Sequence, residues 1–176
     1  MIDQLFIDTD CISAFLWVGT ENILVSLYGG KIVIPKQVYD ELSNPRVVHL
    51  KQKTDLLIDS GEASIGRIMA GTEESILYLS LTHNPEPGLK IIGRGEAASI
   101  VLARQNNGIL ASNNIRDIMP YVIRYELKHT TTADILVKAF QRGLITRAQG
   151  DTIWTNMLKK QRKLPESSFT EYLDRT

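Results

Sequence analysis

The stretch LFIDTDCISAF, residues 5–15, places two aspartates directly after a short apolar run. The run predicts a buried strand, and Asp8 and Asp10 follow it with one residue between them. Such a pair suits an aspartate nucleophile that attacks a phosphoryl group, a metal site that cuts nucleic acid, or a plain helix cap. The stretch by itself leaves all three interpretations open.

Further acids lie beyond other apolar runs of the chain. Glu41 is on the helix predicted after KIVI, Glu96 is in the first turn of the helix predicted after LKII, and Asp117 follows GILAS. Because the carboxyl ends of parallel strands meet at one edge of a sheet, we expect these acids to lie near Asp8. Each acid alone also suits a capping or surface role, so their joint position carries the prediction.

Carboxylates crowded at one edge repel one another, and their pKa values rise unless a cation compensates. Mg²⁺ and Mn²⁺ prefer oxygen ligands and typically bridge a few carboxylates to a substrate phosphate. No histidine lies at a predicted strand end, and the single cysteine, Cys11, is predicted to be a small buried residue, which argues against zinc. The pattern therefore predicts one or two Mg²⁺ or Mn²⁺ ions that activate a water for attack on a phosphate.

Predicted strands and helices alternate along the chain at short spacing. The predicted strands are residues 5–7, 31–34, 64–69, 89–92 and 108–112. The predicted helices are residues 10–16, 21–28, 35–43, 47–59, 72–81, 95–105, 114–122, 130–145 and 146–163, the last of them either one helix or a broken pair. This alternation predicts an α/β protein of three layers, α/β/α, with a mostly parallel central sheet and a C-terminal helical extension.

Length and composition indicate one globular domain over residues 1–176. No apolar run is long enough to span a bilayer and no signal peptide is recognisable, so we expect a cytoplasmic protein without membrane association. The lone cysteine fits that compartment. Residues 1–119 carry 10 Lys and Arg against 14 Asp and Glu, whereas residues 120–176 carry 10 against 6. The basic tail is either a track for a polyanion or a solvated helix face.

Four segments of the chain resemble, in order and spacing, the four acidic motifs of PIN-domain ribonucleases. The segments are FIDTDCISAFL, IPKQVYDEL, GRGEAASIVLA and ILASNNIRDI. The last is similar to the form found in VapC-type toxins of toxin–antitoxin modules. The resemblance assigns catalysis to Asp8, Glu41, Glu96 and Asp117.

The resemblance places all four acids at the metal site: we expect Asp8, Glu96 and Asp117 to hold the metal and Glu41 to bind through water or a second ion. The resemblance covers a core at about 4–125 and leaves a helical extension at about 127–176. It makes Asp10, Ser112 and Asn114 supporting residues. Two positions depart from the family pattern, since Glu96 stands where Asp is commoner and Asn114 where other branches have Asp.

The resemblance implies a metal-dependent endoribonuclease with RNA as substrate, a small antitoxin as partner, and a homodimer. Arg94, next to Glu96, is a candidate contact for the substrate phosphate. A phosphatase of the haloacid-dehalogenase-like class is the main alternative, but it needs a Gly-Asp with a second Asp about four residues on. The chain has Gly150-Asp151 with Thr155 at that place. A PIN-like interaction module without catalysis is the third interpretation.

Overall fold

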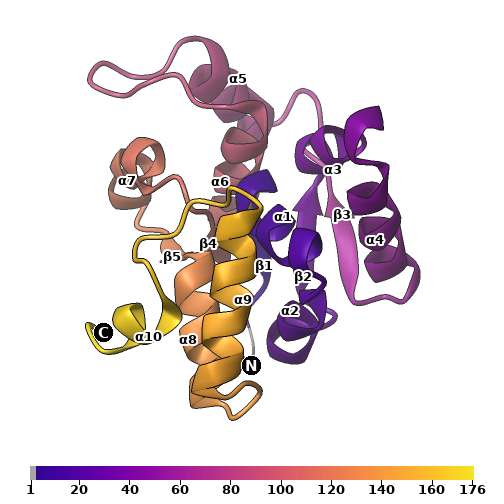
Figure 1. Ribbon diagram of the computed structural model, residues 1–176. Coiled ribbons are helices and arrows are strands. Elements are labelled where there is room, and N and C mark those ends of the chain that lie inside the picture. Colours follow the sequence, from indigo (N-terminus) through magenta and orange to yellow (C-terminus); the bar gives the residue numbers. More distant parts are fainter. Residues whose placement is uncertain (1–2) are drawn as a thin grey trace.

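The computed structural model describes residues 3–176 and contains a five-stranded sheet in which all neighbours are parallel, in the order β3-β2-β1-β4-β5 (Figure 1). The strands are β1 (Leu5–Ile7), β2 (Ile32–Pro35), β3 (Ala63–Gly66), β4 (Ile109–Ala111) and β5 (Lys128–Thr130). With β1 at the centre, its carboxyl end lies between those of β2 and β4. The residue that follows β1 is Asp8.

Side chains of each strand alternate between two hydrophobic cores, one on each face of the sheet. In β1, Leu5 and Ile7 belong to the larger core and Phe6 belongs to the smaller one. In β2, Ile32 and Val33 divide in the same way. Because both faces are buried, the strands read as unbroken apolar runs rather than as alternating patterns.

The helices are divided between these two cores. Those that contribute to the larger core are α1 (Thr9–Val18), α2 (Glu21–Tyr28), α3 (Lys36–Leu42), α4 (Val48–Asp59), α8 (Thr132–Gln141), α9 (Arg147–Lys159) and α10 (Phe169–Leu173). A short 3₁₀ turn, Pro45–Val47, precedes α4. Those that contribute to the smaller core are α5 (Glu73–His83), α6 (Arg94–Gln105) and α7 (Ile115–Arg124). The predicted three-layer α/β/α fold is thus confirmed.

Among residues 3–176, no single helix is long and apolar enough to cross a membrane. Helices α1 and α2 meet that criterion only when taken together, and they are bent by 119° at the break between them.

The prediction of a strand at residues 89–92 was wrong. This segment is irregular, although Ile92 packs into the smaller core and its backbone N–H donates to the Leu81 carbonyl at 3.2 Å. The Lys90 carbonyl accepts a hydrogen bond from the Tyr121 hydroxyl. Strands β2 and β4 occupy the two edges of β1, and β5 occupies the other edge of β4. The segment is therefore held by the Ile92 side chain and by these two hydrogen bonds rather than by strand pairing.

The C-terminal part also differs from the prediction. Residues 128–130, assigned by sequence to the helical extension, form β5 and pair with β4. Residues 147–159 form one continuous helix, α9, and α10 was not predicted. The extension belongs to the larger core, because Trp154 and Phe169 are fully buried there.

Candidate active site

A pocket of about 220 Å³ lies where the carboxyl end of β1, the end of α3 and the start of α6 meet. We call it the acid pocket. Its lining residues are Asp8, Thr9, Asp10, Glu41, Gly93, Gly95 and Glu96. Four of these side chains are carboxylates: Asp8 and Asp10 at the start of α1, Glu41 in α3 and Glu96 in the first turn of α6.

Asp8 is the most deeply placed of these acids, with 2% of its surface exposed. It caps α1, and its Oδ1 accepts a hydrogen bond from the Cys11 backbone N–H at 2.8 Å. Burial raises the pKa of Asp8 to about 7, with smaller upward contributions from Asp10 and Glu96, whereas hydrogen bonds from Ser112 and Cys11 lower it. Asp8 is therefore a helix cap and also a buried carboxylate facing other acids.

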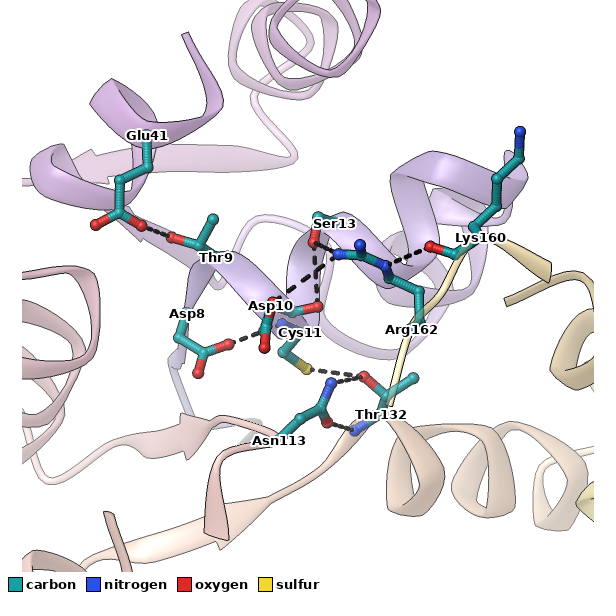
Figure 2. Close-up of polar contacts among 10 residues, drawn as sticks. All are labelled: Asp8, Thr9, Asp10, Cys11, Ser13, Glu41, Asn113, Thr132, Lys160 and Arg162. Carbon is teal, nitrogen blue, oxygen red and sulfur yellow. Dashed lines mark hydrogen bonds and ion pairs between the residues drawn. The ribbon is translucent and has the colours of Figure 1, made fainter. Parts of the chain in front are cut away.

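Glu41 reaches the pocket from the last turn of α3 and joins three elements. Its carboxylate accepts a hydrogen bond from the Thr9 hydroxyl (Figure 2). It also accepts one from the Gly95 backbone N–H at 3.2 Å. A Cβ at Gly95 would lie 3.0 Å from Glu41 Oε2, so a larger residue there would push the Glu41 carboxylate away from its present position. The helix after β2 thus places its carboxylate against the starts of α1 and α6.

Asn114 links Glu96 to Asp117. Its Nδ2 donates to Glu96 Oε1 at 2.6 Å and to Asp117 Oδ2 at 3.0 Å. The other oxygen of Glu96 accepts from the Gly93 backbone N–H at 3.1 Å and so caps α6. Asp117 does not line the acid pocket and has Lys90 Nζ at 4.0 Å. Asn114 therefore connects Asp117 to the pocket, and it neutralises neither carboxylate.

Asp10 lies at the rim, beside a basic side chain from the other end of the chain. Its Oδ1 is 3.9 Å from Nη1 of Arg162, and the same nitrogen donates to the Ser13 hydroxyl at 3.3 Å. The Arg162 Nε donates to the Lys160 carbonyl at 3.0 Å, which fixes the guanidinium over the start of α1 (Figure 2). The segment after α9 thus brings positive charge to the edge of the acid pocket.

Arg94, the candidate phosphate contact, does not line the pocket. Its Nε donates to the Tyr78 hydroxyl on α5 at 3.4 Å. Ser112 is buried, and its side-chain oxygen accepts from the Asn114 backbone N–H at 3.4 Å. Ser112 therefore contacts both Asp8 and the turn that carries Asn114.

Sequence reasoning missed Thr9, Gly95 and Arg162 as parts of this region. Thr9 lies between the two aspartates and Gly95 precedes Glu96, so proximity to the motifs was a usable signal. Arg162 had no local signal, because it is 149 residues from its partner Ser13.

The donor set fits a hard divalent cation by its chemistry. The pocket offers carboxylate and hydroxyl oxygens without histidine, which Mg²⁺ and Mn²⁺ prefer. Among residues 3–176, no three Asp, Glu, His or Cys side chains are gathered closely enough to hold an ion together.

Replacing Asn114 with aspartate is expected to place a third carboxylate between Glu96 and Asp117. Without added metal, loss of both hydrogen bonds and the new repulsion should lower the melting temperature by roughly 3–8 °C, from about 1–2 kcal/mol. Mn²⁺ should then stabilise Asn114→Asp more than the wild type in a thermal shift assay. Asn22→Asp, on the exposed side of α2, is the matched control. Equal melting temperatures and equal responses to Mn²⁺ would show that Asn114 does not separate these acids.

The family model described as DUF3368, a PIN domain, matches residues 4–176. No curated protein and no solved structure shows a significant match to the chain. PIN domains have a nuclease-like fold and are generally metal-dependent nucleases that use divalent cations. The match covers β1 to α10, including the acid pocket and the C-terminal segment that carries Arg162. The chain therefore belongs to the PIN-domain family.

Proposed function

We propose that this protein is a Mg²⁺- or Mn²⁺-dependent endoribonuclease that hydrolyses RNA phosphodiesters. The observation that carries the proposal is the acid pocket, where carboxylates from β1, α3 and α6 meet at the carboxyl edge of a parallel sheet. Sites of α/β sheets form at this edge. Membership in the PIN-domain family supports nuclease chemistry there.

In this proposal Asp8, Glu96 and Asp117 hold the metal, and Glu41 completes the catalytic set. When bound, the cation would compensate the negative charge of the phosphate and lower the pKa of the attacking water. The chain's other residues position these acids. Thr9 and the Gly95 backbone orient Glu41, and Asn114 holds Asp117 beside Glu96.

RNA is the proposed substrate because positive charge from the C-terminal segment lies at the pocket rim. Arg162 lies 3.9 Å from Asp10, and Lys163 lines a hollow that shares Asp10 with the acid pocket. Lysine and arginine contacts to phosphates supply sequence-independent affinity for nucleic acid that weakens as salt concentration rises.

A circular single-stranded RNA tests the endonuclease proposal, because only an internal cut linearises it. With Mn²⁺ we expect linear product and no inorganic phosphate from a phosphomonoester such as p-nitrophenyl phosphate. Release of phosphate from the monoester with the circle intact would support a phosphatase and contradict the proposal. No reaction with either substrate would favour an interaction module.

We also propose that the protein is a cytoplasmic toxin restrained by a small antitoxin and that it forms a homodimer. Exposed apolar side chains support a protein interface, among them Ile76 and Leu79 on α5 and Ile123 on α7, which are 67%, 55% and 72% exposed. Expression of the chain alone should slow growth of the host, and Asp8→Asn should relieve that effect. Growth inhibition that persists in this variant would separate toxicity from the acid pocket.

A further inference from the structure

A second pocket, of about 440 Å³, lies beside the C-terminal segment. We call it the Tyr172 pocket. The lining residues that matter here are Asn113, Ile115, Lys163, Leu164, Pro165 and Tyr172. The volume is in the range of sites that enclose small organic groups. Figure 1 shows the segment after α9 running toward α7 before it turns into α10.

A hollow of about 220 Å³ has lining residues in common with both the Tyr172 pocket and the acid pocket. This connecting hollow shares Asp10 with the acid pocket, and it shares Asn113 and Lys163 with the Tyr172 pocket. Arg162 also lines it. A chain of anionic groups could therefore pass from the acid pocket across two basic side chains into the Tyr172 pocket.

The turn after β4 carries residues that contact both pockets. Asn114 contacts Glu96 and Asp117, while its neighbours Asn113 and Ile115 line the Tyr172 pocket. A ligand in the Tyr172 pocket would thus contact the residues on either side of Asn114, whose side chain positions two of the proposed metal ligands. The two pockets are placed to hold neighbouring parts of one substrate.

The lining suits a flat group with a polar edge. Ile115, Leu164 and Pro165 supply apolar surface. The Tyr172 ring is held in place because its hydroxyl hydrogen-bonds Asp134 Oδ1 at 2.7 Å. Burial, together with this hydrogen bond, raises the pKa of Tyr172 to about 12, so this hydroxyl stays protonated.

Two donors face this apolar surface. Asn113 Oδ1 accepts from the Thr132 backbone N–H at 2.9 Å, and its Nδ2 donates to Thr132 Oγ1 at 2.9 Å, which fixes the amide and leaves its second N–H for another acceptor. Within residues 3–176, Lys163 forms no ion pair.

We propose that the Tyr172 pocket binds one unpaired base of the single-stranded RNA substrate, next to the cleaved phosphodiester, while Arg162 and Lys163 contact the intervening phosphate. This inference rests on the proposed nuclease function and adds a specificity site to it. Recognition of RNA sequence typically uses splayed bases stacked on aromatic side chains. The two donors select a base edge that carries a carbonyl oxygen.

The structure favours RNA over a protein segment as the occupant. The hollow beside the Tyr172 pocket is lined by the basic side chains Arg162 and Lys163, and it shares Asp10 with the acid pocket. A phosphate followed by a base matches that order of charged and apolar surface. An apolar protein segment would leave Lys163, which forms no ion pair within residues 3–176, without counter-charge.

Binding of fluorescein-labelled RNA in EDTA tests this proposal without cleavage. Wild type should bind a short single-stranded RNA of mixed sequence at least about 10-fold more tightly than the same ribose-phosphate chain without bases. Ile115→Glu should reduce that ratio to near one, whereas Ile123→Glu, at the far end of the same helix, should retain it. Lys163→Ala should lower the affinity for intact and abasic RNA by the same factor and reduce the salt dependence of binding. Lys159→Ala is its control.

Equal binding of intact and abasic RNA by the wild type would overturn the inference, as would a ratio unchanged by Ile115→Glu. Loss of a co-purified small protein in Ile115→Glu, with the RNA ratio unchanged, would assign the pocket to that protein instead. Base-dependent binding without any metal-dependent cleavage would overturn the proposed function while the base site stands. Metal-dependent cleavage together with equal binding of intact and abasic RNA would overturn the base site while the proposed function stands.

Discussion

Asp8→Asn is expected to lower kcat/KM for RNA cleavage by at least about 100-fold, the largest loss of activity we expect from one substitution in this chain. Asparagine is a good helix cap and has nearly the same shape, so the hydrogen bond to the Cys11 backbone N–H can persist. What the variant lacks is the negative charge at the most buried oxygen donor of the acid pocket. Initial rates over a range of RNA concentrations, at saturating Mn²⁺, measure the effect.

Asp59→Asn is the matched control, because this aspartate is exposed at the end of α4 and away from the acid pocket. It should cleave at the wild-type rate. If Asp8→Asn kept wild-type kcat/KM, Asp8 would be a cap for α1 and no part of the catalytic set.

The same substitution is expected to stabilise the protein at alkaline pH in EDTA. Burial raises the pKa of Asp8 to about 7 from its usual 3.8, so the folded chain holds this proton more tightly than the unfolded chain. The stability contributed by the neutral carboxyl is present in full below pH 3.8 and is lost as the pH rises through 7. Above that pH the fold must bury a charge beside other acids.

Asparagine has no such proton to lose. We therefore expect Asp8→Asn to raise the melting temperature by roughly 5 °C or more at about pH 8, corresponding to about 2–4 kcal/mol, and by much less near pH 4. Thermal unfolding of both proteins across this pH range gives the difference directly. A difference that stays flat with pH, as expected for Asp59→Asn, would show that Asp8 is not held as a buried acid with a raised pKa.

Together, these two results would show that the negative charge of Asp8 lowers the stability of the fold and is needed for RNA cleavage. Removing that charge makes the fold more stable and the enzyme inactive. Such opposite effects are typical of strained or charged functional sites and do not occur for an ordinary helix cap. The contrast between activity and stability therefore distinguishes the two roles that the sequence left open for Asp8.

The sequence was sufficient to predict the fold class and the acids near the pocket because both depend on local patterns. Unbroken apolar runs marked the buried parallel strands, and Asp8 and Glu96 stand at helix starts where capping chemistry is recognisable. The wrong assignments came from competition between segments. Residues 89–92 and 128–130 are both short, and only the second finds a free strand edge beside β4. Nothing within either segment reveals which one pairs.

The positions of the side chains around the acid pocket could not be predicted from local sequence either, because they depend on contacts between distant segments. Asn114 holds Glu96, which is 18 residues away, and Arg162 meets Ser13 across 149 residues. Whether a basic tail lies along a substrate path or faces solvent depends on where α9 packs. Buried Trp154 and Phe169 decide that packing, and their partners are distant in the sequence.

The most direct test of the account is a Mn²⁺ titration of RNA cleavage by protein stripped with EDTA and then dialysed. The account predicts no cleavage before metal is added, a saturable rise in rate with Mn²⁺ for the wild type and Asp59→Asn, and no rise for Asp8→Asn over the same range. Cleavage that persists in excess EDTA, or a titration that is the same for Asp8→Asn as for the wild type, would contradict it.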